Sequence, residues 1–433
     1  MRAVTTLTFM FALACTACGG GGGGSSSPGT VTSGGGTSTP PPATTPPVTI
    51  TAPVIATQPS SQSVAAGTPV TFSVAASGAT LSYQWLRDGT PVAGATSSSY
   101  TLATTTLEDR GSKWRVQVTN PGGTVSSDEA VLTVSGIRLL AGAPSSYGTS
   151  DGDGAQARFH EPFGVAVDAS GNVFAADFYN QTIRKISPAG EVSTYAGAAE
   201  LYGRVDGTLN NARFTYPTGI AFDKAGNLYV ADSAFRLIRK ITPQGAVSTL
   251  TQLPKGTSVD GQSSGMFQPS GIALDSSDNI YVTNGVGTRR IAPDMSYSII
   301  EGFDTRDEVA TSIVPTIRGV AVDPNNNVYV SSLQGDVRKL GSPGAVIAGT
   351  SGVQGYMATD RHGNVYVADY ANSVVRKITP AGVVSIIAGN GTRGLELGAN
   401  LSAPLPSPRG IAVDANGILY VAVGHAIVKI YQP

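Results

Sequence analysis

Two carboxylates that lie nine positions apart, Asp168 and Asp177, are followed by the basic pair Arg184 and Lys185. Paired carboxylates beside a cation are residue types that acid–base catalysis and metal binding both use. The segment that contains them reads GVAVDASGNVFAADFYNQTIRKI, and its alternation of residue types is typical of strands. The first question is therefore whether these groups do chemistry or hold strands together.

The same pattern recurs along the chain, so its copies can be compared with one another. Six copies end an apolar strand with an Asp that precedes a Gly- or Asn-rich turn, and these residues are Asp168, Asp223, Asp275, Asp323, Asp360 and Asp414. A catalytic geometry is needed once, whereas a group that every repeat carries serves the repeat. We expect these six carboxylates to accept backbone N–H groups in Asx-type turns.

The second carboxylate position varies together with a basic position seven residues later. The position equivalent to Asp177 holds, in the later copies, Asp232, Asn284, Ser332, Asp369 and Val423. The position equivalent to Arg184 holds Arg239, Arg289, Arg338, Arg376 and Val428. The last copy therefore lacks both partners. The two positions fall diagonally on one face of a hairpin. The pattern predicts a structural Asp–Arg pair between the middle strands of most repeats.

The segment DGDGAQARF, residues 151–159, begins like a calcium loop. An EF-type loop needs an oxygen ligand at its fifth position and a bidentate Glu at its twelfth. Those places hold Ala155 and Pro162, and the segment recurs as DGTLNNARF from Asp206 and DGQSSGMF from Asp260. A turn between repeats is the favoured interpretation. We expect no cofactor, with calcium as the minority alternative.

The repeats themselves predict the fold. Each copy holds short strands that cannot bury both faces alone, which is typical of a β-propeller blade. The recurring P-x-G-[VI]-A, D-x-x-G-N and IRKI-[ST]-P-x-G patterns resemble the NHL repeat over residues 136–433. The resemblance implies an all-β, six-bladed NHL-type propeller. The last copy stops after its third strand, so we expect residues 137–142, IRLLAG, to complete it and close the ring.

Residues 53–135 alternate in a different pattern. Trp85 and a corner that reads Asp109-x-Gly111-x-x-Trp114 resemble a bacterial immunoglobulin-like domain. The resemblance implies a β-sandwich in which apolar packing replaces the inter-sheet disulfide. Its favoured role is that of a spacer, and adhesion or ligand binding is the alternative.

The first residues are typical of an export signal. Residues 1–18 contain one Arg, an apolar run and small residues that end at Cys18. Residues 19–52 are rich in Gly, Ser, Thr and Pro, which predicts a disordered linker. The arrangement resembles the lipobox of bacterial lipoproteins, which implies lipidation of Cys18 and a lipid anchor in the outer membrane or at the cell surface. Simple cleavage of a secretion signal is the alternative.

Composition and missing motifs exclude several classes of function. The formal net charge is −1 and charged residues make up 13% of the chain, so bulk electrostatics predict no nucleic-acid partner. His160, His362 and His425 stand at non-equivalent places and cannot be matched to the zinc-binding histidines of the NHL-like peptidylglycine amidating lyase. The sequence contains neither a G-x-S-x-G elbow nor a phosphate loop.

Function is expected in loops that vary while the scaffold repeats. The connections between second and third strands share one face with those that lead into the inner strands. The candidate binding residues on that face are Phe178, Tyr179, Asn180, Phe235, Arg236, Tyr370 and Asn372. The leading hypothesis is a monomeric, envelope-anchored, non-catalytic protein that binds a protein or carbohydrate ligand. The alternative is an extracytoplasmic metal-dependent hydrolase or lactonase that acts at the propeller channel.

Overall fold

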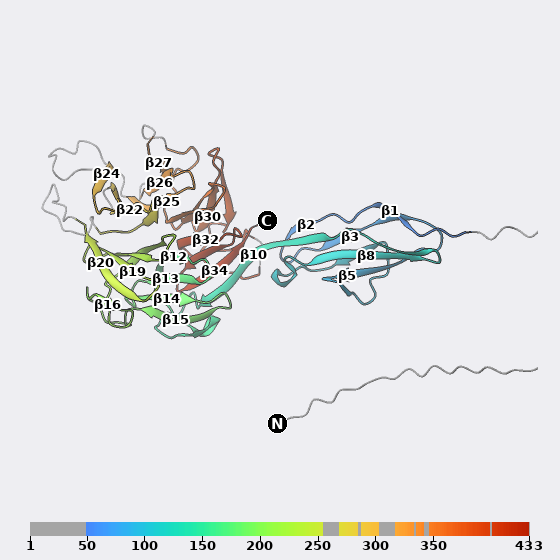
Figure 1. The fold of residues 1–433 in the computed structure, drawn as a ribbon, viewed down its shortest axis with the longest axis horizontal. Coiled ribbons are helices and arrows are strands. Elements are labelled where there is room, and N and C mark those ends of the chain that lie inside the picture. Colours follow the sequence, from blue (N-terminus) through green and yellow to red (C-terminus); the bar gives the residue numbers. More distant parts are fainter. Residues whose placement is uncertain are drawn as a thin grey trace, which may run out of the picture. The chain divides into compact units, whose positions relative to one another are not determined.

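The computed structural model describes residues 49–253, 268–284, 287–302, 317–332, 335–341, 346–398 and 401–432. In this part of the chain the fold is all-β, and helical structure is confined to two short 3-10 turns (Figure 1). The signal segment with Cys18 and nearly all of the linker lie outside the described residues, so both stay predictions. None of the helices in the described ranges is long and apolar enough to span a membrane.

The first folded part consists of short strands that share one apolar core. Its strands are β1 (Val54–Thr57), β2 (Gln62–Ala65), β3 (Val70–Ser73), β4 (Ala75–Ser77), β5 (Ser82–Arg87), β6 (Thr90–Pro91), β7 (Ser99–Leu102), β8 (Lys113–Asn120) and β9 (Gly123–Ser126). Phe72, Trp85 and Trp114 are almost completely buried in the core. The rings of Phe72 and Trp114 stack with their centroids 5.2 Å apart. The corner before β8 is fixed by Asp109, whose carboxylate accepts the backbone N–H of Thr106 and pairs with Arg87.

One long strand, β10 (Ala130–Gly142), joins this part to the repeats. Its first half pairs with β8 and, in parallel, with β2. Its second half pairs antiparallel with the last strand of the chain, β34 (Ala426–Tyr431), from Gly136 opposite Tyr431 to Gly142 opposite Ala426. The predicted pairing of residues 137–142 with the C-terminal strand is therefore present. The expected domain boundary between residues 135 and 136 falls inside this strand.

The strands between residues 152 and 388 form five separate antiparallel sheets, which are the five blades of a β-propeller (Figure 1). Blade one contains β11 (Gly152–Asp153), β12 (Pro162–Val167), β13 (Val173–Asp177), β14 (Thr182–Ile186) and β15 (Glu191–Ala196). Blade two contains β16 (Gly207–Thr208), β17 (Pro217–Phe222), β18 (Leu228–Asp232), β19 (Leu237–Ile241) and β20 (Ala246–Gln252). Blade three contains β21 (Ile272–Leu274), β22 (Ile280–Thr283), β23 (Gly287–Ile291) and β24 (Tyr297–Gly302). Blade four contains β25 (Ile317–Val322), β26 (Val328–Ser332) and β27 (Val337–Lys339). Blade five contains β28 (Met357–Thr359), β29 (Val365–Asp369), β30 (Val374–Ile378) and β31 (Val384–Ala388).

The prediction of a six-bladed propeller is wrong, because the structure has five blades and the last repeat forms no sheet of its own. Its strands β32 (Pro408–Val413), β33 (Leu419–Val423) and β34 pair through β10 into a nine-stranded sheet that continues to β8, β5 and β6. The physical reason is the length of β10, which pairs with β8 and β2 in one core and with β34 in the next. Within the nine-stranded sheet, β32 contacts both β12 of blade one and β28 of blade five.

Glycines in the first strand of each repeat allow neighbouring backbones to approach closely. A Cβ atom on Gly164 would overlap the carbonyl oxygen of Thr218 in blade two. A Cβ atom on Gly410 would likewise overlap the carbonyl oxygen of Phe163 in blade one. The recurring glycine of the P-x-G motif is therefore explained by packing between neighbouring strands rather than by ligand binding.

The six recurring aspartates lie in the turns that follow the first strand of each repeat. Asp360 is representative, because it accepts hydrogen bonds from the backbone of His362 and Asn364 and from the hydroxyl of Tyr366. The same backbone turn surrounds all six carboxylates, which belong to Asp168, Asp223, Asp275, Asp323, Asp360 and Asp414. Burial raises the pKa of Asp360, but the hydrogen bonds from Asn364 and Tyr366 outweigh burial and leave that pKa below its usual value. These carboxylates thus hold the turns.

Candidate functional site

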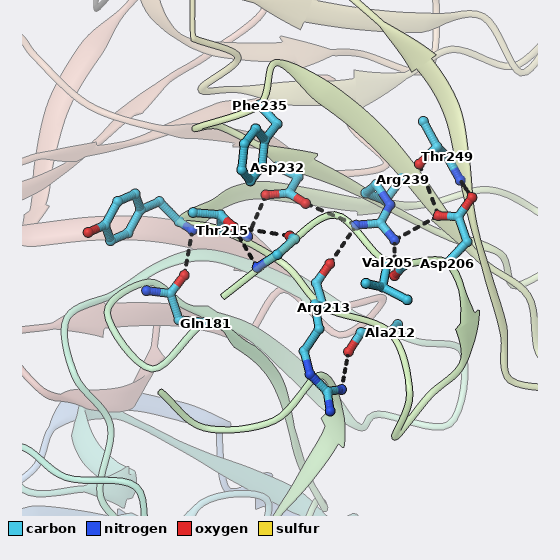
Figure 2. A network of polar contacts seen from close by, with 12 residues as sticks. Gln181, Val205, Asp206, Ala212, Arg213, Thr215, Asp232, Phe235, Arg239 and Thr249 are labelled. Atoms are coloured by element: carbon cyan, nitrogen blue, oxygen red, sulfur yellow. Dashed lines mark hydrogen bonds and ion pairs between the residues drawn. The ribbon is translucent and has the colours of Figure 1, made fainter. Parts of the chain in front are cut away.

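The second carboxylate position forms a buried ionic network between the middle strands. Figure 2 shows it in blade two, where Arg239 and Asp232 are both fully buried. Nη1 of Arg239 donates to Oδ2 of Asp232 at 3.0 Å and Nη2 donates to Oδ1 of Asp206 at 2.8 Å. The same guanidinium also donates to the carbonyl oxygens of Val205 and Arg213. Every contact of this cation is therefore with its own blade.

Blade one repeats this network around Arg184, which contacts Asp177 at 2.9 Å and Asp151 at 2.6 Å. Asp151 is the first residue of the calcium-like segment, and its carboxylate also accepts the hydroxyl of Thr194. The carboxylate of Asp151 thus already pairs with an arginine of its own blade. The third copy of the segment, from Asp260, lies outside the described residues.

The remaining repeats keep the ionic network only in part. Blade five has the pair Asp369–Arg376 at 2.8 Å, whereas Arg338 of blade four pairs with Asp336 two residues before it. In blade three the corresponding position holds Asn284, which is buried. The Asp–Arg pair that the sequence predicts is therefore seen in blades one, two and five.

A second feature is a cluster of aromatic side chains at the end of the strands where β13 connects to β14. We call it the aromatic face, and it comprises Tyr147, His160, Phe163, Phe178, Tyr179, Tyr216, Tyr356, Tyr370, Arg409 and His425. These residues come from blades one, two and five, from β32, and from loops that precede first strands or connect middle strands. Segments that are far apart in sequence meet here because β32 lies beside β12.

Phe178 lies at the centre of the aromatic face. Its ring centroid is 4.6 Å from that of Phe163 and 4.9 Å from that of Tyr216, with which it stacks. Tyr179 lies edge-on to Phe178 at 4.9 Å. Tyr179 and Tyr216 are 44% and 38% exposed, so a row of rings with open edges faces solvent. Such contacts between aromatic rings fix the orientation of each ring.

Two histidines extend this face towards the last repeat. The ring of His160 lies 4.4 Å from Tyr147, 4.7 Å from Tyr179 and 5.7 Å from His425. Nδ1 of His425 accepts the backbone N–H of Glu161 at 3.1 Å, which requires that nitrogen to be unprotonated. Burial and the neighbouring His160 lower the pKa of His425, and the nearby Glu161 offsets them only in part. His425 is therefore held in its neutral form near pH 7.

Arg409 lies between two rings of the aromatic face. Its guanidinium carbon is 4.5 Å from the centroid of Phe163 and 5.2 Å from that of Tyr370, and Nη2 pairs with Glu161 at 3.0 Å. A pocket of about 160 Å³ opens beside it, lined by Phe163, Gln354, Gly355, Tyr356, Tyr370 and Arg409. The pocket thus combines aromatic walls with one guanidinium and one amide, a composition typical of small-ligand sites.

The structure divides the predicted binding residues into three groups. Phe178, Tyr179 and Tyr370 belong to the aromatic face. Asn180 is 3% exposed, and its amide donates to Asp177 and to the carbonyl of Gly148. The amide of Asn372 donates in the same way to Asp369 and to the carbonyl of Gly352.

The third group is the blade-two pair, Phe235 and Arg236. The guanidinium of Arg204 covers the ring of Phe235 at 5.7 Å, and both members of the pair are half-buried. Asn180 and Asn372, in contrast, are structural. Their Asp-x-x-Asn spacing lets each side-chain amide donate to the buried aspartate of its own blade.

Sequence reasoning did not identify Tyr147, His160, Phe163, Tyr216, Tyr356, Arg409 or His425 as members of one site. A usable signal existed, since loops before first strands were expected on the same face as the middle-strand loops. The middle-strand loops alone do not contain all of these residues, and His160 and His425 occupy different positions in their repeats although the repeats are neighbours.

A second hollow, of about 430 Å³, lies at the opposite ends of the strands. The turns of blades two to five surround it, with the carboxylates of Asp223, Asp275, Asp323 and Asp360 among its lining. Each of these carboxylates already accepts backbone N–H groups of its own turn. Among the described residues, no three His, Cys, Asp or Glu side chains are grouped so that they could hold a metal ion.

Two curated proteins show partial sequence similarity to the chain. Protein SUPPRESSOR OF QUENCHING 1 of Arabidopsis thaliana is 28% identical over 221 residues, which are 49% of this chain and 20% of that protein. NHL repeat-containing protein 2 of Bos taurus is 32% identical over 90 residues, which are 20% of this chain and 12% of that protein. The chain thus spans a fifth or less of these relatives. The predicted NHL resemblance is supported for part of the repeats, and no family model matches the chain.

Solved structures share the fold over a larger part of the chain. An auxiliary nutrient binding protein from Bacteroides ovatus superposes with a TM-score of 0.57 at 13% identity, covering 88% of this chain and 98% of its own. At this identity the similarity shows the fold alone. It extends beyond the propeller, because residues 136–433 make up less of the chain than the superposition covers.

Proposed function

We propose that the chain is a non-catalytic binding protein that holds its ligand on the aromatic face. The observation that carries this proposal is the contiguity of the face, in which ten side chains meet, two from strands and eight from loops beside four sheets. Tyr147, Tyr179, Tyr216 and Tyr370 are 65%, 44%, 38% and 36% exposed. A row of exposed rings of this kind leaves apolar surface in water, and a bound ligand would remove that surface from water.

The composition of the face also suits recognition. Tyrosine and arginine are enriched among the residues that dominate binding energy, and tyrosine presents a large contact area at a small cost in side-chain entropy. The rings of Phe163 and Phe178 are held by several neighbours, so little ordering is needed when a ligand binds. Both a protein and a carbohydrate ligand are compatible with such a surface.

No specific observation favours the alternative of a metal-dependent hydrolase or lactonase. Catalysis at the channel would need carboxylates with oxygens free to bind a metal ion or take a proton. The carboxylates that line the hollow opposite the aromatic face, such as Asp275 and Asp360, accept several hydrogen bonds from their own turns. The buried carboxylates of Asp177 and Asp232 are bonded to arginines.

The remainder of the proposal concerns placement. A lipid on Cys18, the linker and the first folded part would together hold the propeller away from an envelope surface as a monomer. This part rests on the sequence patterns of residues 1–52 and would be tested by metabolic labelling with a palmitate analogue, with Cys18→Ala as the control.

Binding measurements on the purified full chain test the function itself. Tyr179→Ala removes an exposed ring that packs edge-on against Phe178, and Tyr297→Ala removes a ring that is 57% exposed at the start of β24. Extracted envelope glycans and proteins should be retained by the immobilised wild type and by Tyr297→Ala, and be retained less by Tyr179→Ala. Equal retention by both variants, or turnover of a bound ligand, would contradict the proposal.

A further inference from the structure

The pocket beside Arg409 allows the ligand class to be narrowed. Its walls are the rings of Phe163, Tyr356 and Tyr370, and its polar groups are the guanidinium of Arg409 and the amide of Gln354. Resting on the function proposed above, we infer that this pocket takes a neutral sugar residue, so that the aromatic face binds a neutral oligosaccharide.

Charge is the first step of the argument. Arg409 is the cation of the pocket, and its charge is already balanced by Glu161 at 3.0 Å. The side chains of this pair are 19% and 32% exposed, so both charges keep some contact with solvent and need no ligand to balance them. An anionic ligand would have to compete with Glu161 for the guanidinium, and a cationic ligand would face Arg409 itself. A ligand without net charge meets neither obstacle.

Hydrogen-bonding capacity is the second step. The contact with Glu161 uses only part of the Arg409 guanidinium, which carries five N–H donors. The remaining N–H groups can donate to two neighbouring acceptors of a ligand, because the guanidinium is planar. The amide of Gln354 both donates and accepts. Neighbouring hydroxyl groups of a sugar are donors and acceptors at once, so they match an amide and a fork of donors in a way that an apolar ligand does not.

Preorganisation of these groups is the third step. The backbone N–H of Gln354 donates to Asp369 at 3.2 Å, and its carbonyl accepts the N–H of Tyr370 at 2.8 Å. Arg409 is held between the rings of Phe163 and Tyr370. The backbone of Gln354 and the guanidinium of Arg409 are therefore held in place before a ligand arrives, which reduces the entropy lost on binding.

The aromatic walls supply the remaining contact. One face of a sugar ring presents C–H groups, which pack on the face of an aromatic side chain. Tyr370 is 36% exposed and borders both the pocket and Arg409, so it can cover one sugar residue. The exposed rings of Tyr179 and Tyr216 continue the face outward, which suits a chain of several sugar residues rather than a single one.

Isothermal titration of the full chain tests this assignment. The probes are short neutral gluco-, manno-, galacto- and xylo-oligosaccharides, oligogalacturonides as acidic sugars, and a mixture of short acidic and aromatic peptides. At least one neutral series is expected to bind, with an affinity that changes little with salt because no net charge is neutralised. Tyr370→Ala is expected to weaken this binding about tenfold, in the range of one lost aromatic contact.

Two further variants complete the design. Arg409→Lys keeps the charge and the pairing with Glu161 but loses the planar fork, so it should also weaken the neutral sugar about tenfold. Tyr297→Ala, which removes an exposed ring on β24, should bind as wild type.

Binding of only acidic sugars or only peptides, with loss in Tyr370→Ala, would overturn the neutral-sugar assignment and leave the proposed binding face intact. No measurable binding of any of the three kinds of probe would also overturn the assignment. Neutral-sugar binding that Tyr370→Ala, Arg409→Lys and Tyr179→Ala all leave unchanged would overturn the assignment and the proposed binding face together.

Discussion

Replacing Arg239 by Met tests whether the buried ionic network holds blade two together. The variant keeps an unbranched apolar side chain in place of the arginine stem and removes the guanidinium with its charge and donors. Asp232, which is fully buried, would lose the cation that pairs with it, and the carbonyl oxygens of Val205 and Arg213 would each lose a donor. Breaking a buried ion pair on one side costs about 3–5 kcal/mol, so the free energy of unfolding should fall by about that amount.

The pH dependence of this loss has a definite sign. Burial raises the pKa of Asp232, and Thr215 and Arg239 work against it. Without Arg239 the burial effect is less opposed, so the folded variant favours a protonated carboxyl at this position. A group whose pKa is raised on folding weakens the fold as the pH rises past its ordinary value, about 3.9 for Asp. The variant should therefore lose more stability at pH 8 than at pH 5.

Urea unfolding followed by two signals would measure the effect. Both tryptophans of the chain, Trp85 and Trp114, lie in the core that precedes the propeller, so their fluorescence reports on that part. Far-ultraviolet circular dichroism reports mainly on the more numerous propeller strands. The matched control is Arg213→Met, because the Arg213 guanidinium donates to the carbonyls of Asn210 and Ala212 and, among the described residues, forms no ion pair. The control should cost less than about 1 kcal/mol.

The result that would refute the reasoning is an equal shift of the dichroism transition in Arg239→Met and Arg213→Met. Equal shifts would mean that the network of Figure 2 contributes no more than a half-buried arginine at the rim. A larger shift that did not depend on pH would refute only the role assigned to Asp232.

Three further outcomes are expected. Arg184→Leu should lower the free energy of unfolding by about 3–5 kcal/mol in urea titrations, while ligand affinity of the folded fraction stays unchanged; lost affinity at unchanged stability would contradict the structural role. Hydrogen bonds lower the pKa of Asp360, so the ionised carboxylate stabilises the fold above its ordinary pKa of about 3.9, and this stabilisation is lost as the pH falls through the lowered pKa. In Asp360→Asn the free energy of unfolding should therefore change less with pH in this range. An unchanged pH dependence would count against this account. Because burial and His160 lower the pKa of His425, NMR titration should find it below about 6.5, and His160→Ala should raise it; no change in that variant would show that the contact between the two rings is not electrostatic.

Several local features of the fold could be predicted because each is dictated within one repeat. The Asp before a Gly- or Asn-rich turn, seen at Asp168, has its partners within four residues, so spacing alone places it. Asp177 and Arg184 are joined across one hairpin, and hairpin geometry is set by local sequence. The pairing of residues 137–142 with the last strand is not local, and it could be predicted because the last repeat lacks a strand that the other repeats have.

The number of blades could not be predicted from the number of repeats. A repeat is a property of the sequence, whereas a blade is a separate sheet, and the strands of the last repeat join a sheet that β10 continues. The aromatic face was missed for a related reason. His160 and His425 meet because the last repeat lies beside the first, and their repeat positions differ. Asn180 was assigned to the surface because its role depends on Asp177 being buried, which composition does not reveal.

The continuity of β10 has a mechanical consequence. A force that pulls on the chain before the propeller runs along β10 into its pairing with β34, from Gly136 to Gly142. Hydrogen bonds between antiparallel strands lie perpendicular to the strands. A pull along the strand therefore shears the bonds of the pairing together instead of opening them one after another. If the first residues anchor the chain as proposed, drag on a bound ligand would be resisted by this seam, and the propeller would stay closed while it holds the ligand.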